Sequence, residues 1–267
     1  MSHADDHHAI ERNALRAPHS RRRKERPLMV MRLMLVVLGL TLGVPSLLQA
    51  ESPTGKLAGR ITYSGSALPD QTAEITRDSA FCGTSTTIKD VVIHPKTRGL
   101  EGVVVSIESG NLPSSDAPLA PLVLTNTHCA FLPRTVIGQV GQQLEIRSDD
   151  PVMHNTHISL GSRTFVNVAM IPASRPVRKP LKQPGIYTVK CDAHKFMHAD
   201  VIAFAHPFFS QTDESGSFQI TNLPPGEHVV NIWHHTLGSY QQTVRVSAEA
   251  ETTIAFDFAA HAESNKK

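Results

Sequence analysis

No nucleophile elbow, phosphate-binding loop, zinc-protease helix or suitably placed pair of carboxylates occurs in this sequence. Each of these motifs assembles reacting groups within a few residues, so their absence argues against the corresponding enzymes. The sequence also lacks a basic stripe and an aromatic platform, which are features that nucleic-acid binding requires. We therefore expect neither an enzyme nor a nucleic-acid partner.

Long hydrophobic runs are also missing, apart from one near the start. That run covers residues 33–44, and its 12 residues are too few to span a bilayer comfortably. It follows the basic run Arg21–Lys24 and precedes a small-residue site at Ala50, which is the order of a secretory signal peptide. We expect residues 1–50 to be removed by cleavage near Ala50, so that the mature protein is periplasmic. The alternative is an uncleaved anchor.

The slightly basic balance of the chain belongs to this leader. The whole sequence has a formal charge of +2, whereas the part after Ala50 has about −2. A leader of 50 residues is longer than most signal peptides, so we expect translation to start at Met29 or Met31. Once the leader is cleaved, we expect no stable membrane insertion.

No convincing amphipathic helix follows residue 50. Short alternating or β-branched runs recur instead, separated by Gly, Pro, Asn and Asp, and they predict an all-β fold built of sandwiches. The strands we expect cover residues 56–63, 103–107, 144–147, 186–191, 200–204, 217–220, 229–233, 242–246 and 252–258.

We expect these strands to form two modules. Residues 121–206 form an inner sandwich, which is inserted between residues 55–120, the first strands of an outer sandwich, and residues 207–258, which complete it. Such insertion is tolerated because the ends of a compact domain often lie close together. Residues 109–120 are expected to be a linker, residues 173–184 a loop of the inner module and residues 259–267 a polar tail.

The strongest functional signal lies in the inner module. Cys191, His194 and Met197 form a C-x2-H-x2-M motif, and His154 precedes Cys191 by 37 positions. A thiolate, two imidazoles and a thioether are the ligands of a blue-copper electron-transfer site. Alternation along residues 186–191 places Cys191 on the inward face of a strand. The sequence therefore predicts one mononuclear copper site with these four ligands.

The axial ligand of this site stays open. Only two residues separate His194 from Met197, and His198 is a competing nitrogen ligand that would move the site away from the blue type. A binuclear centre would need a second cysteine in the loop, and the loop has none. The thioether argues against zinc.

Only three cysteines occur in the chain. With Cys191 assigned to the metal, Cys82 and Cys129 remain as a pair in an oxidising compartment. A disulfide between them would close a separation of 47 residues and contribute about 4 kcal/mol in the chain-entropy model. The alternative is two free, buried thiols.

The surroundings of the motif carry a family resemblance. A strand that ends in an acidic turn and then His154-Asn155 resembles the cupredoxin pattern, in which the Asn braces the ligand loop through hydrogen bonds. Together with segments 78–83 and 129–134, the chain resembles exported plastocyanin-like proteins of the methylamine-utilisation type. The resemblance implies a Greek-key cupredoxin sandwich.

The C-terminal part carries a second resemblance. A D-x-x-G turn at residues 213–216, an F-x-I strand at 218–220 and an L-P-P-G turn at 223–226 resemble the carboxypeptidase regulatory-like domain. Such domains usually begin with a strand of the form found at residues 55–61. This resemblance implies a transthyretin-like β-sandwich for the outer module.

These features predict a copper protein that carries single electrons between redox partners, such as a cytochrome. We expect His194 to be the exit route, with its ring edge near the surface beside Phe196. The first alternative is copper trafficking or tolerance, in which the ion is cargo. The second is a binding scaffold in which the metal is only structural.

Overall fold

The computed structural model describes residues 53–108, 110, 112–114 and 119–259 of the chain. The expected leader and all but the first residue of the expected polar tail lie outside the described residues. In the described part no helix is both long and apolar enough to cross a membrane.

The described part is almost entirely β, which confirms the predicted fold class. Helix α1 covers Ser79–Cys82. The strands are β1 (Gly55–Thr62), β2 (Gln71–Glu74), β3 (Ser85–Ile88), β4 (Val104–Ile107), β5 (Leu122–Thr127), β6 (Ala130–Leu132), β7 (Thr135–Gln139), β8 (Gln143–Ser148), β9 (His154–Leu160), β10 (Arg163–Met170), β11 (Val177–Pro180), β12 (Gly185–Cys191), β13 (His198–Phe204), β14 (Phe209–Gln211), β15 (Ser217–Leu223), β16 (Gly226–His234), β17 (Gly238–Val246) and β18 (Glu251–Asp257).

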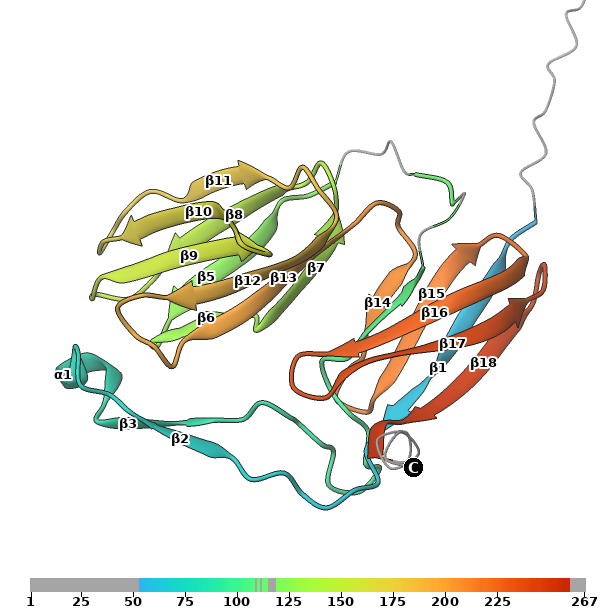
Figure 1. Cartoon of the computed structure of the whole chain (residues 1–267), viewed down its shortest axis with the longest axis horizontal. Coiled ribbons are helices and arrows are strands. Elements are labelled where there is room, and N and C mark those ends of the chain that lie inside the picture. The colour runs from blue at the N-terminus through green and yellow to red at the C-terminus, as the bar shows by residue number, and fades with distance from the viewer. Residues whose placement is uncertain (1–52, 109, 111, 115–118, 260–267) are drawn as a thin grey trace, which may run out of the picture. The chain divides into compact units, whose positions relative to one another are not determined.

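Strands β5 to β13 build an inner sandwich from one continuous stretch of chain (Figure 1). One sheet has the order β10-β9-β12-β13-β7 and the other has the order β11-β8-β5-β6. Both contribute to a single hydrophobic core, in which Leu124, Ile146, Ile158 and Val189 are fully buried. Burial of alternate residues along β12 follows the alternation seen in the sequence.

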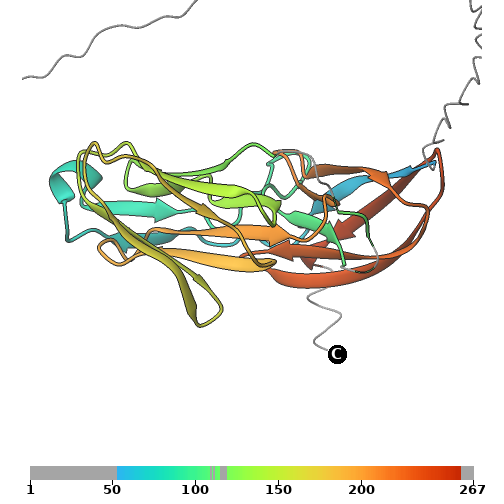
Figure 2. The same cartoon turned by 90° about the horizontal axis from the view of Figure 1, so that it is seen from above.

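The outer sandwich brings together the first and the last strands of the described part of the chain. One sheet has the order β15-β1-β18 and the other has the order β14-β4-β16-β17. Figures 1 and 2 show the blue strand β1 lying among the red strands of the C-terminal part, and β1 pairs in parallel with β18. Leu57, Leu100, Val105 and Ile232 belong to a core that is separate from that of the inner sandwich. We propose that residues 55–120 and 207–258 form one domain and that residues 121–206 form a second one inserted into it, which fits these pairings.

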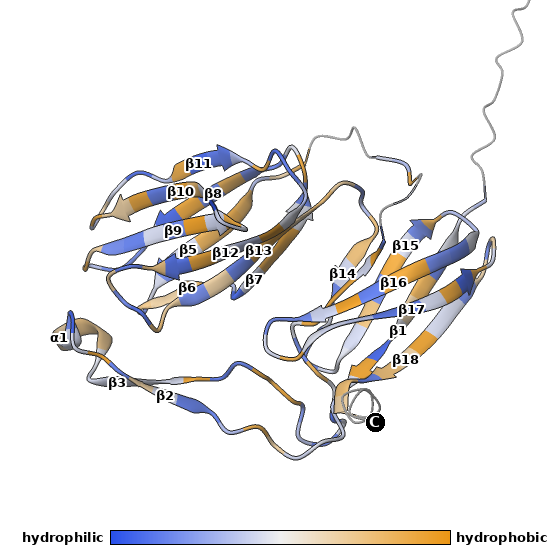
Figure 3. Cartoon of the chain, viewed as in Figure 1, coloured by the Kyte–Doolittle hydropathy of each residue, from blue (hydrophilic) through white to orange (hydrophobic). Residues whose placement is uncertain are grey.

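A third part, residues 71–88, belongs to neither sandwich, and we refer to it as the arm. Strands β2 and β3 pair only with each other in the described structure, and α1 lies between them. Strand β2 is largely hydrophilic in Figure 3, and no residue of β2, β3 or α1 is buried. Hydrophobic packing therefore contributes little to holding the arm in place.

Each of the nine expected strands coincides with an observed strand, with ends shifted by a few residues. The sequence pattern did not predict the other strands, most of which are short or polar. Residues 173–184 were expected to be a loop, and this was wrong in part because they contain β11, which pairs with β8. A strand at the edge of a sheet tolerates the proline that ends β11, since one side of it needs no ladder partner.

Candidate metal centre

Three metal-ligating side chains meet inside the inner sandwich. His154 begins β9, Cys191 ends β12, and His194 lies in the turn between β12 and β13. Their exposed fractions are 0 %, 1 % and 2 %, and one ligand atom from each lies within 4.8 Å of the others. Three of the four predicted ligands are thus brought together in a site closed to water.

Strand pairing explains how residues far apart in the chain converge. Strands β9 and β12 are antiparallel neighbours, with Cys191 opposite Thr156 in their register. The first residues of β9 therefore lie beside the end of β12. The turn after Cys191 closes through a hydrogen bond of 2.9 Å from the Met197 N–H to the His194 carbonyl oxygen. This tight turn returns His194 towards the cysteine.

Backbone donors surround the sulfur of Cys191. The N–H groups of Asn155 and His194 point at Sγ from 3.4 and 3.3 Å. Burial raises the pKa of Cys191, but His154 and these backbone N–H groups outweigh it, so that its pKa lies below the ordinary value. The pocket therefore favours the thiolate, which is the form that binds metals.

His154 is held by one nitrogen and left open at the other. Its Nε2 lies 2.7 Å from Oδ2 of Asp150, while its Nδ1 is buried and has no hydrogen-bond partner in the described structure. Burial lowers the pKa of His154, but Cys191 and Asp150 outweigh it, so that its pKa is raised. A buried nitrogen without a partner is rare in folded proteins and fits a metal-ligand position.

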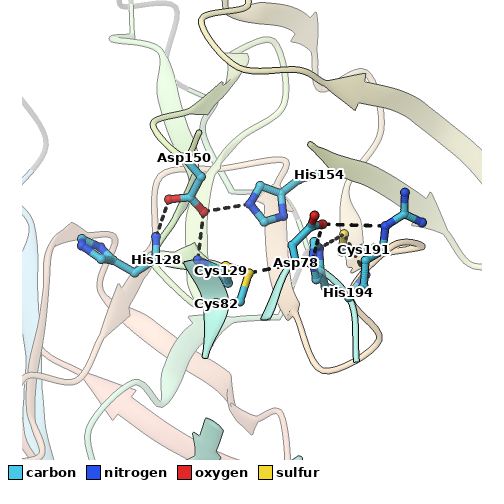
Figure 4. The surroundings of a disulfide bond; sticks show 9 residues. Asp78, Cys82, His128, Cys129, Asp150, His154, Cys191 and His194 are labelled. Atoms are coloured by element: carbon cyan, nitrogen blue, oxygen red, sulfur yellow. Dashed lines mark hydrogen bonds and ion pairs between the residues drawn. A yellow bond between two sulfur atoms is a disulfide. The ribbon is translucent and has the colours of Figure 1, made fainter. Parts of the chain in front are cut away.

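Asp150 was not assigned a role from the sequence. Besides His154, its carboxylate accepts hydrogen bonds from the N–H groups of His128 and Cys129 at 2.7 and 2.9 Å (Figure 4). The signal was present in the sequence as a carboxylate four residues before the histidine. Metal-ligating histidines generally donate their second N–H to such a group, which fixes the ring and its tautomer.

His194 presents Nδ1 to the thiolate, at 3.7 Å from Sγ of Cys191. Its Nε2 lies 3.2 Å from Oδ2 of Asp78 and 3.9 Å from Sγ of Cys82, both in the arm. Burial lowers the pKa of His194. The expectation of a ring edge near the surface was wrong, because the arm covers this histidine and leaves it 2 % exposed.

Two further predicted residues, Met197 and Asn155, also lie in this part of the inner sandwich. Met197 is 2 % exposed and belongs to the same core cluster as Cys191, so its burial suits an axial ligand. Asn155 contacts the thiolate through its backbone, whereas its side-chain amide donates to Asn167 at 2.7 Å. The hydrogen bond expected from Asn155 to the ligand loop is therefore made by its backbone N–H.

His198 does not join the centre. Its Nδ1 lies 3.2 Å from the carbonyl oxygen of Phe196, and its Nε2 lies 3.2 Å from Oδ1 of Asp90. Both ring nitrogens are thus engaged away from the thiolate. Met197, Ala199 and Val201 pack into the inner core, so the alternation of β13 places His198 on the opposite face of the strand.

Cys82 and Cys129 form a disulfide with a Cα–Cα distance of 5.6 Å, and Cys191 is the free cysteine of the described part. Cys129, Asp150 and His154 also lie close enough to hold an ion. The bonded sulfur of Cys129 is not a thiolate, so that second set does not compete. Two imidazoles, a thiolate and a buried thioether fit copper better than a harder ion.

No protein-family model matches this chain, and no curated protein matches it either. Among solved structures it is similar to a Cu-containing nitrite reductase from Thermus scotoductus SA-01, with 19 % identity, a TM-score of 0.30 and coverage of 37 % of this chain and 25 % of that one. For amicyanin from Paracoccus versutus the identity is 19 %, the TM-score 0.29 and the coverage 38 % and 97 %.

A purple cupredoxin from Nitrosopumilus maritimus is 17 % identical, with a TM-score of 0.28 and coverage of 32 % of this chain and 99 % of that one. The chain spans about a quarter of the length of the nitrite reductase. These comparisons do not confirm the methylamine-utilisation-type or carboxypeptidase regulatory-like resemblance. The chemistry of the site is indicated by its donor set.

Proposed function

We propose that this chain is a periplasmic mononuclear copper protein that carries single electrons between protein partners such as a cytochrome, and that it is not an enzyme. The observation that supports this most directly is the convergence of His154 and His194 on the thiolate of Cys191 in a buried pocket. Copper in this pocket would supply a one-electron couple between Cu(I) and Cu(II).

The protein's own residues prepare the pocket for that role. Two backbone N–H groups hold the Cys191 sulfur, and Asp150 holds His154 with its free nitrogen towards the sulfur. A donor set fixed by the fold resists rearrangement when the charge of an ion changes. Met197 would be the axial ligand, and its thioether would keep the site accessible to Cu(I).

The deciding experiment is visible absorption and electron paramagnetic resonance of the mature protein loaded with Cu(II). We expect an intense thiolate-to-copper band that is lost in Cys191→Ser. His157→Gln is the matched control. His157 is a partly exposed histidine on β9, the strand that carries His154, and its ring pairs with Asp192 outside the donor set. A spectrum without a thiolate band in the wild-type protein would refute the proposal.

Copper trafficking is the second candidate, and the burial of His194 is the observation that favours it. An electron carrier benefits from an exposed ligand edge, whereas a cargo site benefits from enclosure. Repeated oxidation and reduction without loss of metal would support the electron carrier. Transfer of Cu(I) from the protein to a competing acceptor would support trafficking.

A further inference from the structure

The cover over His194 comes from a segment outside both sandwiches. Within the arm, Asp78 and Cys82 approach the same nitrogen of His194, at 3.2 and 3.9 Å. Figure 4 shows both residues beside the histidine, with the disulfide partner Cys129 next to Cys82 on the side away from His194. Removal of the arm would therefore expose the outer face of this ligand.

Apart from its disulfide, the arm has few anchors of its own, and the ion pair between Asp90 and Arg134 of the inner sandwich lies just beyond its end. Ile75 is its one buried residue, and its two strands form a sheet of their own. An isolated two-stranded hairpin is marginally stable in water. Asp78, which reaches the buried His194 at 3.2 Å, has a side chain that is itself 33 % exposed, so this contact is open to water on the side of the arm.

The two ends of the disulfide differ in rigidity. Cys129 is 4 % exposed and lies in the turn between β5 and β6, where the Asp150 carboxylate accepts a hydrogen bond from its backbone. Cys82 is half-buried and ends α1, in the arm. The bond thus ties a weakly held segment to a firmly held one.

We propose that the Cys82–Cys129 disulfide is a second redox site, a latch that keeps the arm over the metal centre until a dithiol reduces it. A thiolate of the dithiol attacks Sγ of Cys82, and the S–S bond breaks with Cys129 leaving as a thiolate that takes up a proton. The second thiol then displaces Cys82, which leaves as a thiol. Two electrons and two protons pass to the protein, and the dithiol becomes a disulfide.

The latch gives the metal centre two states. With the disulfide intact, His194 is covered and a bound ion is held. With the disulfide reduced, the arm moves away, because regions with few buried apolar contacts open at low free-energy cost, and the ion becomes exchangeable. This consequence rests on the proposed copper function, whereas the opening of the arm does not.

The first test needs no metal. Diethyl pyrocarbonate modifies accessible imidazoles, and its rate at His194 can be followed by mass spectrometry with the partly exposed His157 as an internal reference. We expect the metal-free Cys82→Ser/Cys129→Ser variant to react at His194 at least roughly tenfold faster than the wild type. Asp78→Asn keeps the disulfide, so its His194 should stay protected. Equal protection in the wild type and the double variant would overturn the latch.

The second test follows copper. Loss of the thiolate-to-copper band to a Cu(I)-specific chelator should be at least roughly tenfold faster in the double variant than in the wild type or Asp78→Asn. If His194 opens but no variant forms the band, the latch stands and the copper function fails. If the band forms but is lost at the same rate with His194 protected, the latch fails alone.

Folding of the double variant is checked by circular dichroism. Should it lose its β structure, wild-type protein reduced by a dithiol and alkylated with iodoacetamide takes its place in both tests. Loss of the β structure in both forms would overturn the proposal, because a latch requires that the two sandwiches stay folded when it opens.

Discussion

The carboxylate of Asp150 contacts both the candidate metal centre and the turn beside it. It is 4 % exposed, and it joins the proposed ligand His154 to the turn that carries the disulfide cysteine Cys129. The charge and position of one carboxylate therefore set both the tautomer of a ligand and the geometry of the turn beside it.

Replacing this carboxylate should weaken metal binding. In Asp150→Asn the ring of His154 loses a charged acceptor at 2.7 Å, and we expect the affinity for copper to fall roughly 10- to 100-fold. Competition against a chelator of known affinity measures the change. Asp149→Asn is the control, because Asp149 is exposed and lies next to it in the chain. An unchanged affinity in Asp150→Asn would contradict the assigned role.

His234 makes stability depend on pH. Burial lowers its pKa from 6.5 to about 4, and its Nδ1 accepts hydrogen bonds from the N–H groups of Thr236 and Leu237. Between pH 4 and pH 6.5, His234 therefore binds more protons in the unfolded chain than in the folded one. The free energy of unfolding therefore falls as pH drops from 6.5 towards 4, by up to about 1.4 kcal/mol per pH unit from this residue.

Urea denaturation across this pH range should reveal the effect. His234→Asn retains an acceptor for the two N–H groups but does not titrate between pH 4 and 6.5. The slope of the free energy of unfolding against pH should therefore decrease by up to about 1.4 kcal/mol per pH unit, which corresponds to one proton. Thr243→Asn, at an exposed side chain without a charge on β17, is the control and should leave the slope unchanged. An unaltered slope in His234→Asn would show that this histidine is not the group responsible.

Single residues were predictable where their chemistry is local. Cys191, His154 and His194, which the structure brings together, could be proposed from the sequence because their spacing matches a known ligand set, and Met197 stays a prediction. The burial of His194 could not be foreseen, since Asp78 and Cys82 reach it from the arm, more than a hundred residues away in the chain. Such long-range contacts leave no periodic trace in a single sequence.

At the scale of elements, the turn before β15 depends on a glycine. Gly216 has φ of +80°, and a Cβ there would lie 2.2 Å from the carbonyl oxygen of Ile61. Its own carbonyl oxygen accepts a hydrogen bond of 2.8 Å from the Ile61 N–H, so β1 and the turn are in direct contact. The D-x-x-G motif thus marks a place where two backbones touch.

A pair of alanine substitutions separates the two demands on this glycine. Gly238 has φ of +85°, but a Cβ added there would meet nothing within 4 Å, so Gly238→Ala should cost only the backbone strain of about 1–2 kcal/mol. Gly216→Ala adds a clash between backbones and should cost more than about 3 kcal/mol. Thermal and urea denaturation measure both, and equal losses would contradict the close approach.

Some strands were predictable because one face is buried and the other is wet, but β9 was missed although its burial alternates, because two of its buried residues, His154 and Thr156, are polar. Strands β12 and β18 alternate in this way, whereas β2 and β3 bury nothing and so lack the signal. The polar strand β11 was missed for the same reason. Alternation also does not reveal which strands pair, because pairing depends on contacts between distant segments.

At the scale of the whole molecule, the outer sandwich is made of two separate stretches of chain. Strand β1 lies between β15 and β18, and β4 lies between β14 and β16. The first stretch therefore has partners on both sides of each of its sandwich strands. Cutting the linker that follows it should not release it.

A protease site inserted after Ser114 tests this expectation. We expect the two fragments to co-elute under native conditions, even in the Cys82→Ser/Cys129→Ser background in which no disulfide joins them. Gel filtration followed by mass spectrometry gives the result, with uncut protein as the reference. Separate elution of a folded C-terminal fragment would show that the paired strands contribute too little to hold the stretches together.

The parallel pairing of β1 with β18 also fixes the order in which the molecule can be completed. A growing chain emerges from its amino end, so the inner sandwich can close while β18 has not yet been synthesised. Until then the core of the outer sandwich is incomplete, so Leu57 and Ile61, which are fully buried in the folded protein, stay exposed. The strand that is made first is protected last, and pairings this distant in sequence make folding slow and prone to aggregation.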